Sequence, residues 1–352
     1  MRWPLMFLIA AACGDDAATG EGAARDDAAG SGRDAAAPFT GLALRGTNLS
    51  GAEFGNGGMF GQSYTYPDQT YGYTSADYFV AKGMTAFRLP FAWERLQPTL
   101  NGPFDAAEHD RLKTTVEHLR AKGAKVILDP HNYARYGGKV IGTADVPNAA
   151  FADLWTRLAD DFKGDPGVVF GLMNEPHGMP TEQWRDAANV AIAAIRATGA
   201  TNLITVPGVA YTGVHSWLSD SYGTPNGVAL LSIVDSGDNY AFEGHQYLDS
   251  DYSGTHPECR SATIGAEVFA GFTAWLRTNH KRAFIGEIGA GANATCLTAL
   301  DGVFDHVAAN DDVYLGWTWW SAGPWWGDSY FMNLEPKAGS DVPQMAVVAD
   351  HL

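Results

Sequence analysis

The sequence Val168-Val-Phe-Gly-Leu-Met-Asn-Glu-Pro176 decides the fold, because two polar residues follow directly on an apolar run. The run is typical of a buried strand, so Asn174 and Glu175 stand at its carboxyl end. Similar runs recur along the chain, and each is a candidate strand. The candidates are residues 43–48, 85–89, 125–129, 168–174, 203–206, 241–245, 283–287 and 315–320.

Amphipathic stretches lie between most of these runs, clearest at residues 106–121, 151–162, 182–197 and 265–279. In the first, Leu112, Val116 and Leu119 recur at intervals of four and three, as one buried helix face requires. Strands that alternate with helices predict a parallel sheet, and eight such strands can close into a barrel. We therefore expect an α/β fold, a (β/α)₈ TIM barrel with a single catalytic domain over residues 38–352. A doubly wound open sheet is the alternative.

Polar or aromatic residues of the kind found in active sites stand at the ends of these strands. In a barrel, the carboxyl ends of all strands meet on one face, where such enzymes place their active sites. This shared position predicts one site. Its candidate residues are Arg88, His131, Asn174, Glu175, His245, Glu287 and Trp320.

Glu175 and Glu287 suit the hydrolysis of a glycosidic bond. That reaction needs one carboxylic acid to protonate the leaving oxygen and a second carboxylate to act at the anomeric carbon. Glu287 lies inside the apolar sequence Phe284-Ile-Gly-Glu-Ile-Gly289, where a charge is costly unless it is paired or functional. Either residue alone could be a cap or a salt-bridge partner, but together, on the fourth and seventh strands, they favour catalysis.

Several motifs resemble glycoside hydrolase family 5 of clan A, in the endoglucanase branch that includes secreted fungal cellulases. Asn174-Glu175-Pro176 and the glutamate on the seventh strand match the clan. The resemblance covers residues 42–322. Its further motifs are Arg45-Gly-Thr-Asn-Leu-Ser-Gly-Ala-Glu-Phe54, Phe87-Arg-Leu-Pro90, His131-Asn-Tyr-Ala-Arg-Tyr136, His245-Gln-Tyr-Leu-Asp-Ser-Asp251 and Gly254-Thr-His-Pro-Glu-Cys259.

This resemblance implies a retaining endo-β-1,4-glucanase that acts on cellulose or related β-glucans by double displacement. It implies that Glu175 is the general acid/base and that Glu287 is the nucleophile. It also implies a substrate-binding set and a disulfide near Cys259, for which Cys296 is a possible partner in an oxidising compartment. The substrate-binding set is Arg88, His131, Asn174, His245, Tyr247 and Trp320.

Two alternatives remain at this point. The chain could be a β-mannanase or another β-glycanase of the same family, because specificity lies in loops more than in the catalytic pair. It could also be a surface glycan-binding lipoprotein without turnover, although the presence of both glutamates argues against this. Trp325 and Trp326 follow Gly323-Pro324 in a predicted loop, and we expect one of them to line a glucose subsite.

The first residues predict export. Arg2 precedes an apolar run that ends in small residues before Cys13, typical of a signal peptide over residues 1–13 with a lipoprotein cysteine. An ordinary signal peptide cut nearby is the alternative. Residues 14–37 hold almost only Gly, Ala, Asp, Ser and Arg and predict a disordered linker. We therefore expect a secreted or bacterial cell-surface protein, with possible membrane anchoring through lipidated Cys13.

The formal net charge of −17 should repel phosphate backbones, so nucleic acid is not an expected partner. We expect a monomer with no cofactor and no metal. Asp249-Ser-Asp-Tyr-Ser-Gly254 resembles the start of a calcium loop, but Arg260 stands where the last ligand, a glutamate, is required. Gly289-Ala-Gly-Ala-Asn-Ala294 formally fits a dinucleotide-binding loop, but it lies late in a chain rich in glycine.

Overall fold

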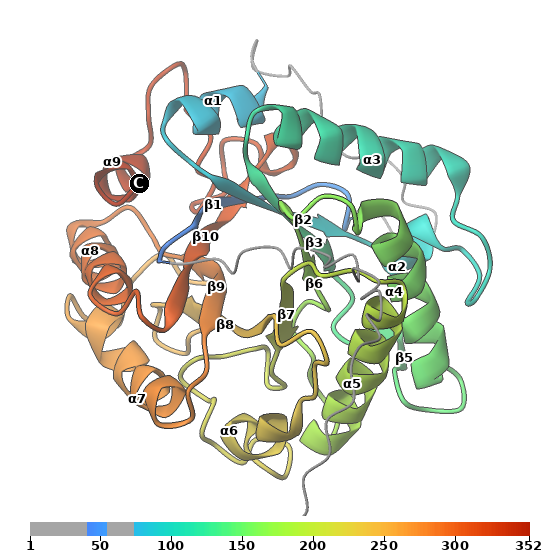
Figure 1. The fold of residues 1–352 in the computed structure, drawn as a ribbon. Coiled ribbons are helices and arrows are strands. Elements are labelled where there is room, and N and C mark those ends of the chain that lie inside the picture. Colours follow the sequence, from blue (N-terminus) through green and yellow to red (C-terminus); the bar gives the residue numbers. More distant parts are fainter. Residues whose placement is uncertain (1–40, 55–73) are drawn as a thin grey trace, which may run out of the picture. The chain divides into compact units, whose positions relative to one another are not determined.

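Eight parallel strands close into a barrel in the computed structural model, which describes residues 41–54 and 74–352 (Figure 1). β1 pairs with both β2 and β10, which excludes an open sheet and confirms the predicted barrel. The predicted signal peptide, Cys13 and the 14–37 linker lie outside the described residues. Around the barrel the strands are β1 (Leu44–Leu49), β10 (Tyr314–Ala322), β9 (Ala283–Gly289), β8 (Tyr240–Tyr247), β7 (Ile204–Pro207), β6 (Val168–Gly171), β3 (Lys125–Pro130) and β2 (Ala86–Phe91).

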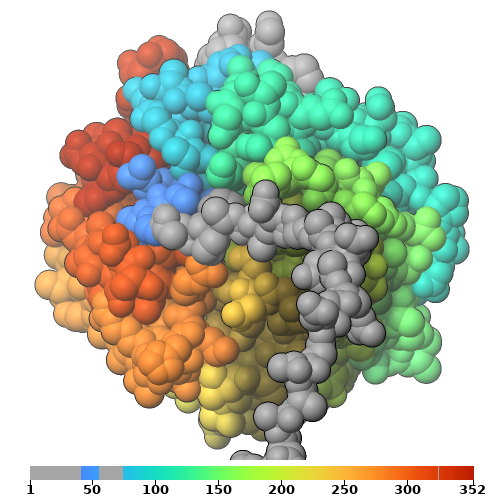
Figure 2. All heavy atoms as spheres, viewed as in Figure 1, coloured from blue at the N-terminus to red at the C-terminus, as the bar shows by residue number. Residues whose placement is uncertain are grey.

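Helices surround the barrel in chain order, as Figure 1 shows, and the same order of colours runs round the surface of the molecule in Figure 2. The predicted helix at residues 106–121 is α3 with the same bounds, and the other three predicted helices differ by at most three residues at either end. Among the described residues, no helix has the length and apolar character needed to cross a membrane. The helices are α1 (Ser75–Ala81), α2 (Trp93–Leu96), α3 (Ala106–Ala121), α4 (Asn148–Phe162), α5 (Thr181–Ala197), α6 (Asn226–Ala229), α7 (Ile264–Thr278), α8 (Ala294–Ala308) and α9 (Pro343–Asp350), with 3₁₀ turns η1 (Leu230–Ser232) and η2 (Pro324–Trp326).

The barrel interior changes from apolar to polar along the strands. Its amino-terminal end is filled by eight apolar side chains, seven of them on strands and one, Leu203, directly before β7: Leu44, Ala86, Ile127, Val169, Leu203, Ala241, Phe284 and Leu315. Two residues further along β2, β3, β7 and β8, where the strand period points side chains inward again, stand Arg88, Asp129, Thr205 and Glu243, all buried. The fold therefore places a buried polar layer beneath the carboxyl-terminal face.

Two local features shape that face. β6 ends at Gly171 rather than at the predicted residue 174, and the backbone N–H of Asn174 donates to the carbonyl of Pro130 at 2.9 Å. After β3, the short strands β4 (Arg135–Tyr136) and β5 (Lys139–Val140) form an antiparallel pair that the sequence did not predict.

The segment after β8 is held by a disulfide. Cys259 and Cys296 are bonded, and Cys296 lies in the first turn of α8. The bond joins the end of the 249–260 segment to a helix of the outer wall. The pairing expected for these two cysteines is confirmed.

Replacing Cys259 and Cys296 together by serine should lower the free energy of unfolding by up to about 4 kcal/mol, because the bond closes a loop of 37 residues. Urea unfolding of the double variant, followed by tryptophan fluorescence, would measure the change. Wild-type protein unfolded in a reducing agent is the control and should match the variant. An unfolding midpoint that neither treatment moves would contradict the prediction.

Candidate active site

The carboxyl ends of six strands bring the eight predicted site residues to one place. Arg88 comes from β2, His131 from the residue after β3, and Trp320 from β10. Asn174 and Glu175 follow β6, His245 and Tyr247 lie on β8, and Glu287 lies on β9. Since parallel strands meet at this face, residues 88 and 287 come within hydrogen-bond distance although 199 positions separate them.

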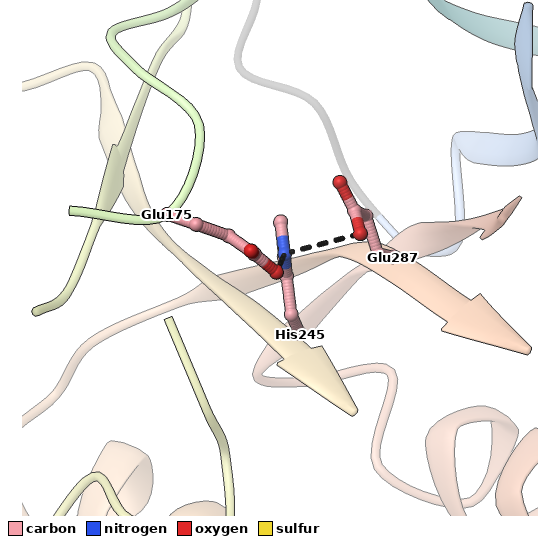
Figure 3. Close-up of side chains that lie close together, drawn as sticks. All are labelled: Glu175, His245 and Glu287. Carbon is pink, nitrogen blue, oxygen red and sulfur yellow. Dashed lines mark hydrogen bonds and ion pairs between the residues drawn. The ribbon is translucent and has the colours of Figure 1, made fainter. Parts of the chain in front are cut away.

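His245 lies between the two glutamates (Figure 3). Its Nδ1 is 2.8 Å from Oε1 of Glu175 and 3.6 Å from Oε2 of Glu287. One oxygen of each carboxyl group and a ring nitrogen of His245 all lie within 4.8 Å of one another. His245 is also the register partner of Glu287 on the neighbouring strand, which fixes their separation through the backbone.

Glu287 is buried and surrounded by donors. Nη1 of Arg88 donates to Oε1 at 3.0 Å, and the Tyr247 hydroxyl donates to Oε2 at 2.6 Å. Burial alone would raise the pKa of Glu287, but the charges of His245, Arg88 and His131 and the Tyr247 hydrogen bond lower it below its usual value. Glu287 is therefore held as a carboxylate.

Glu175 has the opposite electrostatic environment. Burial first, and then the charge of Glu287, raise the pKa of Glu175, although the hydrogen bond to His245 opposes the rise. Its backbone has a positive φ of 44°, a conformation that non-glycine residues seldom adopt and that is common at functional sites. The carboxyl group remains partly open to the cleft, with 14% of the side chain exposed, so it can reach a ligand as an acid.

Asn174, His131 and Trp320 complete the predicted set. The Asn174 side-chain oxygen accepts a hydrogen bond from Nη2 of Arg88 at 2.8 Å, and its amide nitrogen lies 3.0 Å from Nε2 of His131. The His131 ring stacks on Trp320 with centroids 5.2 Å apart and planes 16° apart. The Trp320 ring is thus held in a fixed orientation at the site.

Two buried carboxylates beneath the site were missed from the sequence. Asp129 lies 2.9 Å from Nη1 of Arg88 and 2.8 Å from Nδ1 of His131. Glu243 lies 3.1 Å from Nε of Arg88 and 3.1 Å from Nε2 of His245. The sequence held a pattern that could have identified them: each acid stands two residues before a predicted site histidine, and such a pair lies on the same face of a strand.

A cavity of about 540 Å³ opens on the Glu175 side of the pair. Two stacked pairs of rings line it: His177 on Tyr211 at 4.2 Å between centroids, and His215 on Tyr252 at 4.5 Å. A second cavity of about 280 Å³ includes His131 in its wall, and Tyr133 lines both cavities. Flat rings along an open cavity suit the apolar faces of sugar rings.

The two tryptophans of the last loop differ in exposure. Trp325 is 42% exposed and stacks on Phe54, whereas Trp326 is half-buried and stacks on Tyr330 at 4.0 Å. Trp326 also contacts Trp320 edge to face, with centroids 6.0 Å apart. Neither tryptophan ring lines the two cavities described above. That Trp325 or Trp326 lines a glucose subsite therefore stays a prediction.

The segment that resembles a calcium loop has a structural explanation. The Asp249 carboxylate is buried and accepts hydrogen bonds from the backbone N–H groups of Gly254, Thr255 and His256 at 3.0–3.2 Å. Its oxygens therefore already have donors. The group of Glu175, His245 and Glu287 is compact enough to hold a metal ion. Both oxygens of Glu287, however, already accept hydrogen bonds from Arg88 and Tyr247, which favours proton transfer over metal binding at this site.

Comparisons with known proteins agree with this geometry. Residues 43–323 match the family model for cellulase (glycosyl hydrolase family 5). Endo-beta-1,4-glucanase B of Aspergillus niger is 39% identical over 298 residues, covering 84% of this chain and 86% of the relative. The structure of XacCel5A in complex with cellopentaose is 51% identical, with a TM-score of 0.84, covering 88% of this chain and 99% of that chain. An endo-beta-1,4-glucanase from Xanthomonas axonopodis pv. citri is 45% identical, with a TM-score of 0.81, covering 88% and 98%.

Tyr247→Phe should raise the pKa of Glu287, because it removes a donor that stabilises the carboxylate. Titration of Glu287 by ¹³C NMR, in protein with labelled glutamate, would measure the shift. Tyr78→Phe is the matched control, since the hydroxyl of Tyr78 on α1 also donates to a carboxylate, that of Asp341, and neither residue belongs to the site. A Glu287 titration that is the same in wild type and Tyr247→Phe would contradict the role of the Tyr247 hydroxyl in lowering the pKa of Glu287.

Proposed function

The chain belongs to the cellulase family, glycosyl hydrolase family 5, and we propose that it hydrolyses internal β-1,4-glucosidic bonds of cellulose or related β-glucans with retention of configuration. It is a glycoside hydrolase, an endo-β-1,4-glucanase. The observation that carries the mechanism is the pair Glu175 and Glu287. Their oxygens lie within 4.8 Å, and their pKa values are shifted in opposite directions. This spacing suits a retaining enzyme, since an inverting pair stands farther apart to admit a water.

In the first step, the Glu287 carboxylate attacks the anomeric carbon and forms an ester bond to the sugar. The bond from that carbon to the glycosidic oxygen breaks, and Glu175 gives its proton to the departing oxygen. Ionised Glu287 and protonated Glu175 are the states that their environments favour. The two residues therefore enter the reaction in the required forms at the same pH.

In the second step, water replaces Glu287 at the anomeric carbon. The ester has removed the charge of Glu287, and that charge is the second largest cause that raises the pKa of Glu175. The pKa of Glu175 therefore falls, and Glu175 can accept a proton from the attacking water. Glu287 leaves as a carboxylate, again stabilised by Arg88 and Tyr247.

The surrounding residues orient the sugar chain. Asn174 is held by Arg88 and can bond the 2-hydroxyl of the sugar being cleaved, a contact that strengthens in the transition state. Trp320, fixed by His131, offers a flat floor at that position. The cavity beside Glu175 takes the leaving-group side, because Glu175 must face the departing oxygen. A similar protein, XacCel5A, has been solved with cellopentaose, which supports a β-glucan chain as the substrate.

We further propose that the protein is exported and anchored through lipidated Cys13, and that it acts as a monomer. The signal-like sequence before Cys13 and the polar linker that follows it support export and anchoring. Mass spectrometry of Cys13 in membrane fractions would test the anchor.

Glu175→Gln and Glu287→Gln should each lower kcat by about 10²-fold or more on β-glucans, because each removes an acid–base or nucleophilic group. New reducing ends would be measured on carboxymethyl cellulose, mixed-linkage β-glucan, galactomannan and xylan. Glu182→Gln is the matched control, since Glu182 lies in the first turn of α5, outside the site, and should leave activity unchanged. Release mainly from galactomannan would overturn the substrate, and folded wild-type protein inactive on every polymer would overturn the enzyme assignment.

The first product formed should have the β configuration of the substrate. ¹H NMR of the anomeric protons during the first minutes of cello-oligosaccharide hydrolysis would show the β anomer before mutarotation. An initial α anomer would exclude double displacement while leaving the substrate assignment intact.

A further inference from the structure

Glu243 is a buried carboxylate that the steps above do not use. Its side chain is 1% exposed. One oxygen accepts a hydrogen bond from the Thr205 hydroxyl on β7 at 2.6 Å. The other oxygen lies 3.1 Å from Nε2 of His245 and 3.1 Å from Nε of Arg88. Contacts to β7, β8 and β2 thus hold the carboxylate in one position.

This contact decides which nitrogen of His245 carries a proton. Burial alone would raise the pKa of Glu243, but Arg88, His245 and Thr205 together lower it to about 2. An ionised carboxylate can only accept hydrogen bonds, so Nε2 of His245 must carry the hydrogen. The nitrogen that faces Glu175 and Glu287 is then Nδ1, and any second proton on His245 lies there.

The proton on the acid/base is therefore shared with a histidine. Oε1 of Glu175 and Nδ1 of His245 are 2.8 Å apart, so a proton between them lies on one atom or the other. The pKa of His245 is raised to about 10, since the charges of Glu287, Glu175 and Glu243 outweigh its burial. Glu175 and His245 thus hold their protons as one unit, and the carboxylate of Glu243 lies next to that unit.

We propose that Glu243 is a positioning residue that fixes His245 with Nε2 protonated and, through its charge, keeps the proton that Glu175 and His245 share. The inference rests on the proposed function, because it concerns the proton that Glu175 delivers. Glu243 itself exchanges no proton. Its negative charge favours the protonated form of the Glu175–His245 unit, and its oxygen keeps Nδ1 directed at both glutamates.

The space for Glu243 depends on Gly286, the residue before Glu287. A Cβ atom at position 286 would lie 2.2 Å from Oε1 of Glu243 and 2.9 Å from Nε2 of His245. Any side chain there would push these two atoms out of contact. The glycine beside Glu287 therefore leaves room for the contact that orients His245.

The charged groups around His245 and Glu243 come from several elements. Arg88 on β2 contacts Glu243, while Glu175 after β6 and Glu287 on β9 contact His245. Across Arg88 lies a second acid–histidine pair, Asp129 and His131 on the β3 side. His131 presents its other nitrogen to the amide of Asn174 and not to a carboxyl group, which makes Asp129 a charge-matched control for Glu243.

The test is the pH profile of kcat/KM on cellopentaose, which is neutral. Wild-type hydrolysis tests the proposed function first, and the variants then test this inference alone. Glu243→Gln should move the basic limb to lower pH by about one unit, because a negative charge that favours the protonated unit is lost. In Glu243→Asp the basic limb should lie close to its wild-type pH, because the negative charge is kept. Asp129→Asn should shift the basic limb by less than Glu243→Gln does.

A second substrate separates a proton effect from general damage. An activated dinitrophenyl β-cellobioside needs no proton on its leaving group, so Glu243→Gln should lower its kcat/KM by a smaller factor than that of cellopentaose. Equal losses on both substrates, or a basic limb that coincides with the wild type, would show that Glu243 only packs and would overturn the proposal.

Wild-type protein provides a test that does not depend on the folding of a variant. In enzyme labelled with ¹⁵N-histidine, Nε2 of His245 should stay protonated from about pH 5 to about pH 8. The resonance can be assigned by its loss in His245→Gln. A deprotonated Nε2 anywhere in this range would overturn the proposal whatever the kinetics show.

Discussion

The site depends on one buried cation. Arg88 contacts the carboxylates of Asp129, Glu243 and Glu287, each within 3.1 Å, and donates to the side chains of Asn48 and Asn174. Three buried anions near one another would be prohibitively costly without a cation, and removing one partner from a buried pair typically costs about 3–5 kcal/mol. Arg88 therefore joins β2, β3, β8 and β9 at the level where the barrel changes from apolar to polar.

The same network accounts for the division of labour between two chemically identical side chains. Glu287 lies where Arg88, Tyr247 and His245 converge, so its charge is stabilised although it is buried. Glu175 lies beyond the reach of the Arg88 hydrogen bonds and meets the charge of Glu287, so its charged form is disfavoured. Burial and the surrounding charges, rather than residue type, thus shift the pKa values of the two glutamates in opposite directions, and the proposed roles of acid and nucleophile rest on these shifts.

The sequence contained enough to predict the barrel and to place the eight predicted active-site residues at one face of it, since apolar runs ending in polar residues mark strands whose ends must meet. It could not supply contacts that depend on the closed barrel. Asp129 and Glu243 were visible as acids two residues before histidines, yet only closure shows that both face Arg88. Backbone details were also hidden, because the positive φ of Glu175 and the end of β6 at Gly171 depend on the folded backbone and not on the apolar pattern.

The wall of the larger cavity is held by contacts outside the Arg88 network. The wall of the larger cavity includes Asp251, Tyr252 and Ser253, in a segment ordered by the buried carboxylate of Asp249. The Cys259–Cys296 bond fixes the end of that segment to α8. Neither the Asp249 carboxylate nor the disulfide contacts Arg88. This wall can therefore change in sequence without disturbing the charges around Glu175 and Glu287. A barrel of this kind can therefore keep its chemistry while the loops that receive the leaving group alter which glycan it accepts.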